Sequence, residues 1–403
     1  MTDIHERLAE LRGAGLHRRL RLVDSPQGPR VVLDGAEVLL LCSNNYLGLA
    51  DHPRVRQAAA EAAERWGAGA GASRLISGNL ALHRKLETKL AEFKGAETAL
   101  LFGSGYLANT GTVAALAGRG EVVFSDELNH ASIIDGCRLS RAETFVYRHC
   151  DLEHLAWGLA QARDRAALIV TDGVFSMDGD VAPLPGLVEL ARRHRCLLAV
   201  DDAHGTGALG PGGRGAVAAA GLSEEVDVIV GTLGKALGSY GAYVCARPEI
   251  VDLLVNTARP FIFSTAPPPP AIGAAMAALA LLGSQPGLVE QLRRNGDVLR
   301  EALAESGLDT GPSRTQIVPV IVGGARQAVE LCERVLEQRV FAQAIRPPTV
   351  PDGTSRLRLA VMANHRADEL RGAAAVIAGA ARELGIGGTS AGGATVRELR
   401  RAA

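Results

Sequence analysis

Apolar and polar residues along the chain follow two different periods. From about residue 80, short apolar runs predict strands, and amphipathic stretches with helical spacing separate them. The predicted strands are 98–102, 122–124, 144–147, 168–171, 197–200, 226–230 and 242–245. The helices between them include 82–93, 107–116, 152–163 and 184–194. This alternation predicts an α/β fold with a large, mostly parallel sheet that has helices on both faces.

The two ends of the chain have other patterns. Residues 3–20 predict a helix, and 31–33 and 38–41 predict a hairpin around Asp34-Gly35. After the four prolines 267–270 come a long helical region, a strand (317–322), a helix (325–337), strands 341–345 and 356–360, and a helix (367–384). We therefore expect an N-terminal helix and hairpin (1–45), a large α/β domain (46–280), a small α+β domain (281–385) and a flexible tail (386–403).

Composition narrows the functional classes. The chain has 403 residues and a net charge of -1, so no basic field favours nucleic acid. Its six cysteines are scattered without a Cys-x-x-Cys pair, which argues against a zinc site or a disulfide scaffold and suggests a reducing cytoplasm. Charges occupy the N-terminus where a signal peptide needs an apolar core. The apolar segment 271–282 is short and follows the prolines, so a buried helix is expected there and no membrane span.

Lys235 is the most informative residue. It lies among small residues, with Gly231, Gly234 and Gly238 around it, and glycine lets a backbone approach a bulky ligand closely. Asp201 ends the apolar run 196–200, at a strand tip where open α/β sheets bind ligands. Pyridoxal phosphate (PLP) requires a lysine that holds its aldehyde as a Schiff base and an acid that keeps its pyridine nitrogen protonated. A structural salt bridge of Asp201 is the alternative.

Further motifs follow other strands. Residues 102–106 (Phe-Gly-Ser-Gly-Tyr) join a strand to a helix, which suits a phosphate cradle or an ordinary tight turn. His130 follows the strand 122–124 and could stack on a cofactor ring or be simply hydrogen-bonded. The loop 171–180 is polar but contains Val174, Phe175 and Met177, so we expect it to be partly buried beside a ligand.

Three patterns leave alternatives. Arg356 and Arg358 are two residues apart in a predicted strand, so both side chains point to the same face. They could bind a carboxylate there or form a polar outer surface of the sheet. The glycines of 67–72 partly match a dinucleotide-binding pattern, but a predicted helix precedes them where that pattern needs a strand. A serine hydrolase is disfavoured because the chain has no Gly-x-Ser-x-Gly elbow.

Together these motifs resemble the α-oxoamine synthases, PLP enzymes of the aminotransferase fold (fold type I). The resemblance extends from the N-terminal helix to about residue 385. It rests on the segments 43–49, 71–78, 129–133, 174–180, 201–205 and 231–235. Segment 343–351 (Gln-Ala-Ile-Arg-Pro-Pro-Thr-Val-Pro) resembles the biotin-pathway branch of the family. Asn45, where the family frequently has aspartate, and the glycine-rich C-terminal extension are its departures.

The resemblance implies roles for individual residues. Lys235 would hold the cofactor and move a proton, Asp201 would pair with the pyridinium nitrogen, and His130 would stack on the ring and contact substrate. Contacts to the phenolic oxygen and the phosphate would come from Ser176, His204, Gly105, Tyr106, Thr232, Ser264 and Thr265, the last two across a homodimer interface. Substrates would contact Arg18, Asn44, Thr349 and Arg358.

The implied reaction is a decarboxylative condensation of L-alanine with pimeloyl-CoA or pimeloyl-acyl carrier protein. Other α-oxoamine synthases use glycine with acetyl-CoA, glycine with succinyl-CoA, or serine with a long acyl chain, and these remain alternatives. A nucleotide-binding or non-catalytic module built on 67–71 is the alternative from a different class.

Overall fold

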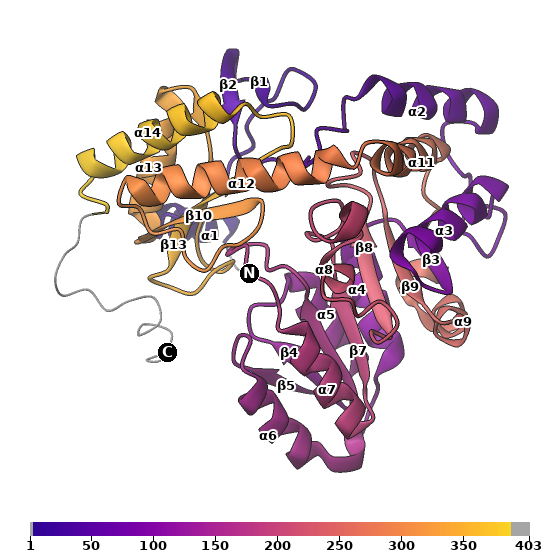
Figure 1. The fold of residues 1–403 in the computed structure, drawn as a ribbon. Helices are drawn as coiled ribbons and strands as arrows, with labels where there is room; N and C mark the ends of the chain where they lie inside the picture. The colour runs from indigo at the N-terminus through magenta and orange to yellow at the C-terminus, as the bar shows by residue number, and fades with distance from the viewer. Residues whose placement is uncertain (1–2, 388–403) are drawn as a thin grey trace. The chain divides into compact units, whose positions relative to one another are not determined.

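The computed structural model describes residues 3–387, and Figure 1 shows its elements. By internal contacts the chain forms two compact units. We call residues 44–176 and 180–292 the large unit, and residues 1–43, 177–179 and those from 293 onward the small unit. The N-terminal helix and hairpin therefore group with the C-terminal part of the chain. Helix α12 (Gly287–Glu305) contains the boundary.

The large unit is built on a seven-stranded sheet of order β3-β9-β8-β7-β6-β4-β5. β9 alone runs opposite to the other six strands, so the expected mostly parallel sheet is confirmed. The strands are β3 (Thr98–Phe102), β4 (Val122–Asp126), β5 (Glu143–Tyr147), β6 (Ala166–Asp172), β7 (Leu197–Asp201), β8 (Val228–Thr232) and β9 (Ala242–Ala246). The apolar runs predicted all seven, each within two residues at either end.

Helices cover both faces of this sheet, as the alternating pattern predicted. On one face α4, α5, α9 and α10 pack on a core that contains Leu100, Val170 and Val244. On the other face lie α3, α6 and α7 (Figure 1). The helices are α2 (Pro53–Trp66), α3 (Ala81–Lys94), α4 (Gly105–Leu116), α5 (Ala131–Ser140), α6 (Leu152–Ala162), α7 (Leu184–His194), α8 (Ala216–Ala219), α9 (Pro248–Thr257), α10 (Arg259–Ile262) and α11 (Pro269–Ser284).

The small unit contains two three-stranded sheets, of order β1-β2-β11 and β10-β13-β12. Its strands are β1 (Arg30–Leu33), β2 (Ala36–Leu40), β10 (Ile317–Gly323), β11 (Val340–Phe341), β12 (Gln343–Ile345) and β13 (Ser355–Ala360). Its helices are α1 (Ile4–Gly13), α13 (Ala325–Glu337) and α14 (Ala367–Glu383). Residues 177–179 join it because Thr315 Oγ1 and Arg314 N donate to the Gly179 carbonyl.

Two expectations for this unit need correction. The N-terminal helix ends at Gly13 rather than near residue 20, since none of its residues is buried and packing does not extend it. The single strand expected over 341–345 is two strands, because Phe341 pairs with β2 whereas Gln343–Ile345 pairs with β13.

The apolar helix α11 is a core helix, as predicted, since Ile272, Ala275, Ala278 and Leu281 are fully buried. Among residues 3–387 no single helix has the length and apolarity to cross a membrane; α11 and α12 meet that test only together, as a bent pair. The tail predicted from residue 386 lies almost wholly outside the described residues.

Candidate active site

Lys235 lies in a tight loop after β8. Its Nζ is 2.8 Å from Nε2 of His204 and its side chain is half-buried. Backbone hydrogen bonds from Leu233 N to Gly241 O (2.9 Å) and from Ser239 N to Leu233 O (2.8 Å) close the loop. The amine is therefore held at the carboxyl edge of the sheet, where parallel strands place ligand contacts.

The glycines around Lys235 have a different purpose from the expected one. A Cβ on Gly231 would meet the Tyr243 ring at 2.2 Å, and one on Gly238, at φ +58°, would meet backbone atoms of Leu49 and Ala50 at 2.5–2.6 Å. Both glycines thus allow the protein to pack against itself. Only Gly234 has open space on its Cβ side, with its nearest neighbour at 3.6 Å.

Asp201 and His130 are joined by a buried network. Asn109 Nδ2, on α4, donates to Asp201 Oδ2 (2.6 Å) and to Ser132 Oγ (2.8 Å). Ser132 Oγ lies 2.7 Å from His130 Nδ1, and Ala203 N donates to Asp201 Oδ1 at 2.9 Å. The structural salt bridge that was the alternative for Asp201 has no counterpart among residues 3–387, where its hydrogen-bond donors are an amide side chain and a backbone N–H. A cationic ring N–H would supply the missing charge.

Electrostatics also place His130, Asp201 and Lys235 close together. Burial lowers the pKa of His130, with the Asp201 charge opposing this and the Lys235 charge adding to it. Asp172 Oδ2 accepts the His130 backbone N–H at 2.8 Å. Burial, followed by the charge of Asp201, raises the pKa of Asp172 well above its ordinary value. The lowered pKa favours the neutral form of His130.

His204 links Lys235 to Asn44. The His204 Nδ1 atom is 2.6 Å from Tyr46 Oη, and Tyr46 Oη donates to Asn44 Oδ1 at 3.0 Å. Tyr46 is fully buried and His204 nearly so. This chain brings together one predicted cofactor residue and one predicted substrate residue, although they are 160 positions apart in the sequence.

The predicted phosphate cradle has the geometry that such a site requires. Ser104 caps α4 by accepting from Leu107 N (3.3 Å), and α4 begins at Gly105. The N–H groups of Gly105 and Tyr106 have no acceptor within the described chain, as the first turn of a helix leaves them. A Cβ on Gly105 would meet nothing within 4 Å, so this helix end is open to an anion.

Four other predicted cofactor residues lie at the end of a strand or in loops of the large unit. Thr232 ends β8, and its hydroxyl donates to Gly241 O and accepts from Gly234 N. Ser176 follows the buried turn 173–175 after β6, which agrees with the partly buried loop that we expected. Ser264 and Thr265 lie between α10 and α11, and Thr265 pairs with Ser73 through an isolated bridge.

The remaining predicted substrate residues lie in the small unit. Arg18 and Thr349 line a cavity of about 950 Å³, together with Arg19, Arg21 and Arg346. Arg358 is a buried residue of β13. The neighbouring Arg356 forms an ion pair with Asp178 and donates to Thr354 O, so it has a structural role, and a solvent-facing polar surface for the two arginines is excluded.

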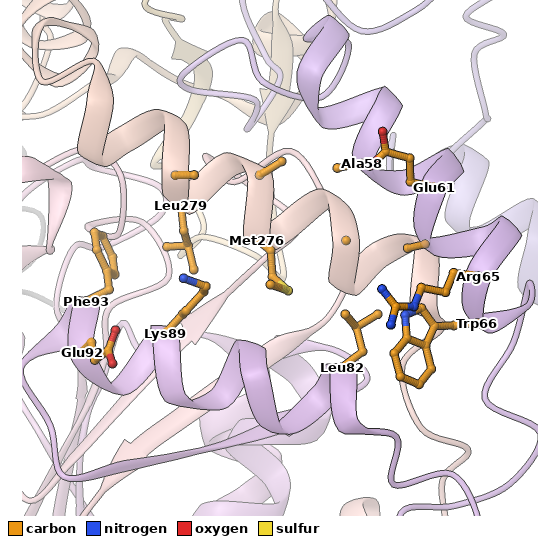
Figure 2. A pocket seen from close by; sticks show the side chains of 14 residues that line it. Ala58, Glu61, Arg65, Trp66, Leu82, Lys89, Glu92, Phe93, Met276 and Leu279 are labelled. Atoms are coloured by element: carbon orange, nitrogen blue, oxygen red, sulfur yellow. The ribbon is translucent and has the colours of Figure 1, made fainter.

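A second hollow has no part in this arrangement. A cavity of about 690 Å³ lies between α2, α3 and α11. Figure 2 shows the side chains that line it, among them the apolar Trp66, Leu82 and Met276. None of the predicted site residues lines it. Glycines 67–72 follow α2, so the helix expected before them is present and the dinucleotide pattern fails.

Sequence reasoning missed Tyr46, Asn109 and Asp172. Asn109 lies in the middle of an apolar helix, and a buried amide on such a face is the one local signal that could have indicated it. Asp172 ends β6 as Asp201 ends the neighbouring β7, and the two are directly paired in register. The predicted strands already placed both aspartates at or just after a strand end, so Asp172 could have been proposed on the same ground as Asp201.

Comparisons with known proteins identify the family of the chain. The sequence pattern of the family described as aminotransferase class I and II matches residues 36–377. An 8-amino-7-oxononanoate synthase of Geobacter sulfurreducens is 56% identical over 382 residues, which cover 94% of this chain and 98% of that protein. The protein of the same name from Symbiobacterium thermophilum is 50% identical over 96% of this chain and 99% of its own length.

Solved structures are similar over the same range. A serine palmitoyltransferase from S. paucimobilis with a bound PLP–myriocin aldimine has a TM-score of 0.90 and 32% identity, covering 95% of this chain and 97% of that one. An 8-amino-7-oxononanoate synthase from Francisella tularensis has a TM-score of 0.75 and 27% identity, covering 87% of this chain and 99% of that one.

Proposed function

Because the chain belongs to the class I and II aminotransferase family, we propose that it catalyses the decarboxylative condensation of L-alanine with a pimeloyl thioester. The products are 8-amino-7-oxononanoate, carbon dioxide and the free thiol, a step of biotin biosynthesis. The observation that carries this proposal is the 56% identity to a synthase of that name across almost its whole length.

The large unit is suited to PLP. When bound, PLP supplies an electron sink for the bonds that are made and broken at the α-carbon of the amino acid. Lys235 would hold its aldehyde carbon, Asp201 its ring nitrogen, and the N–H groups of Gly105 and Tyr106 its phosphate. His130 would stack on the ring, and Ser176 and His204 would contact its phenolic oxygen. Thr232 would add a hydroxyl to the phosphate.

Lys235 is the base that we assign to the α-proton of alanine. A lysine amine must be neutral for this, and burial or a nearby positive charge makes it so. His204 Nε2, 2.8 Å from the amine, is placed to accept a hydrogen bond from the neutral amine or to exchange a proton with it. Asp201, whose carboxylate oxygens accept hydrogen bonds from Asn109 Nδ2 and Ala203 N, would pair with the ring nitrogen.

Four further residues would bind substrates. Asn44 and Arg358 would receive the carboxylate of alanine, for which a guanidinium offers a bidentate grip. Arg18 and Thr349, which line one cavity of the small unit, would contact the acyl substrate. The carrier of the pimeloyl group would be coenzyme A or acyl carrier protein.

The working form would be a homodimer. Ser264 and Thr265 would reach the phosphate in the neighbouring subunit. Leu75, Ile76 and Phe263 are 51%, 80% and 70% exposed, and they flank the segments 72–73 and 265–266 that hydrogen-bond to each other. Exposed apolar residues gathered beside a predicted ligand residue support a protein interface at this place.

A product assay tests the proposed specificity. The PLP-loaded protein is offered alanine or glycine, each with pimeloyl-CoA, acetyl-CoA or a long-chain acyl-CoA, and aminoketones are identified by mass spectrometry. The proposal requires 8-amino-7-oxononanoate from alanine and pimeloyl-CoA as the preferred product. Preferential turnover of glycine with acetyl-CoA would instead assign a different α-oxoamine synthase activity.

A further inference from the structure

A buried histidine outside the proposed site joins two loops that carry site residues. His149 follows β5, and its side chain is 10% exposed. Its Nδ1 lies 3.0 Å from Asp126 Oδ1 and its Nε2 lies 2.7 Å from Asp180 Oδ2. Carboxylates only accept hydrogen bonds, so both ring nitrogens must donate and the ring is an imidazolium. Burial alone would lower the pKa of His149, but the bonds to the two carboxylates raise it to about 12.

On one side of His149, Asp126 holds the turn that leads to His130. Asp126 Oδ1 also accepts Leu128 N (2.9 Å), and the Asp126 carbonyl accepts Asn129 N (3.2 Å). These bonds close the turn that ends at His130, whose own N–H is held by Asp172. Asp126 is almost completely buried, so its charge needs the imidazolium as a partner.

On the other side of His149, Asp180 holds the loop that contains Ser176. The Asp180 carbonyl accepts Phe175 N at 3.0 Å, and Val174 and Val181 form an isolated bridge. Ser176 therefore lies in a turn whose two ends are tied together. The His149 ring also packs edge-on against Phe175, with centroids 4.4 Å apart at 88°. One imidazolium thus holds the ends of both loops.

We propose that His149, bonded between Asp126 and Asp180, is a positioning residue that fixes His130 and Ser176 relative to each other. The inference rests on the proposed function, since those two residues are the ones assigned to the PLP ring and its phenolic oxygen. His149 itself is not proposed to touch cofactor or substrate. Its contribution is pre-organisation, in which a displacement of about 1 Å costs about 100-fold in rate.

The test compares His149→Gln with His365→Gln in the PLP-loaded protein. His365 is a buried histidine of the small unit whose Nδ1 accepts Met362 N, so its replacement also removes a buried hydrogen bond. For His149→Gln we expect kcat to fall about 10- to 100-fold with KM for both substrates changed less than about threefold. The visible absorbance of bound PLP should shift, because Ser176 is displaced. His365→Gln should lower the melting temperature and leave the absorbance unchanged.

A double-mutant cycle gives a second readout. Because both changes disrupt one contact, His149→Gln combined with Asp180→Asn should be no worse in kcat than His149→Gln alone. Additive losses would overturn the inference, as would a His149→Gln protein that loses only thermal stability. Asp126, His149 and Cys150 also have potential ligand atoms within 4.8 Å of one another, so a loss of wild-type activity on treatment with EDTA would overturn it in favour of a metal site.

The two proposals fail in different ways. If the wild-type protein neither gains visible absorbance with PLP nor forms an aminoketone, the proposed function fails and this inference falls with it. If the wild-type protein does both, and His149→Gln matches it in kcat and absorbance, only the role of His149 is refuted.

Discussion

Replacing Lys94 by methionine should destabilise the protein by about 3–5 kcal/mol, because it leaves a buried carboxylate without its cation. Lys94 ends α3, and its Nζ donates to Asp202 Oδ2 (2.6 Å), Arg214 O (2.6 Å) and Thr206 Oγ1 (3.2 Å). Its side chain is 1% exposed and that of Asp202 is 0% exposed. Methionine preserves much of the apolar stem, so the charge is the principal loss.

The effect should depend on pH. Burial raises the pKa of Asp202, and Lys94 lowers it again. Without Lys94 the folded-state pKa rises further above the unfolded value, so the folded protein binds a proton more tightly than the unfolded chain. Stability then falls as pH rises. The deficit of Lys94→Met relative to wild type should therefore be larger at pH 8 than at pH 5.

The assay is denaturant unfolding of the wild-type and variant proteins at both pH values, followed by circular dichroism. Lys85→Met is the matched control, because Lys85 is an exposed residue of the same helix and its loss should change stability by less than about 0.5 kcal/mol. A Lys94→Met protein as stable as this control, or a deficit that does not change between the two pH values, would refute the electrostatic reasoning.

Other substitutions test the proposed site. Asn109→Leu removes the donor shared by Asp201 and Ser132. Because a hydrogen bond to a charged group contributes about 1.5–3 kcal/mol, PLP affinity should fall about 10-fold or more in a titration of the apoprotein. Unchanged affinity would mean that Asn109 does not support Asp201. Arg358→Lys keeps the charge but loses the bidentate grip, so KM for alanine should rise about 10-fold while PLP affinity stays the same, and an equal loss of both would assign Arg358 a structural role. Tyr46→Phe removes the hydroxyl between His204 and Asn44, so kcat should fall more than about threefold in steady-state turnover, and a wild-type kcat would remove this link from the account.

Local patterns predicted the frame of the molecule well. The strands of the large sheet lie within two residues of the predicted positions, because six of them are mostly buried apolar runs; the seventh, the edge strand β5, has only Tyr147 buried. Burial follows directly from such runs. The strand expected over 341–345 was wrong because its halves pair with β2 and β13, which are far apart in the sequence. The N-terminal helix was predicted too long because no packing supports it beyond Gly13.

The candidate site divides in the same way. Lys235, Asp201 and the turn at Gly105 could be identified locally, since each follows a predicted strand and has a chemical reason to be there. Tyr46 could not, because its partner His204 comes near it only in the folded chain. Asn109 had one local signal, an amide in an apolar helix, but its partner Asp201 is also far away in the sequence. The glycines beside Lys235 helped to identify this lysine, but for a reason that the structure does not bear out. They were expected to make room for a ligand, whereas Gly231 and Gly238 allow close packing within the protein.

The central claim is that Lys235 is the residue that holds PLP, and reduction with borohydride tests it most directly. The chain has only four lysines, three of them on α3 (Lys85, Lys89 and Lys94) and the fourth at 235, so peptide mass spectrometry of the reduced, PLP-loaded protein distinguishes them all. The account predicts one phosphopyridoxyl group per chain, on Lys235, and none in Lys235→Ala. A phosphopyridoxyl group on a lysine of α3, or one that persists in Lys235→Ala, would contradict it.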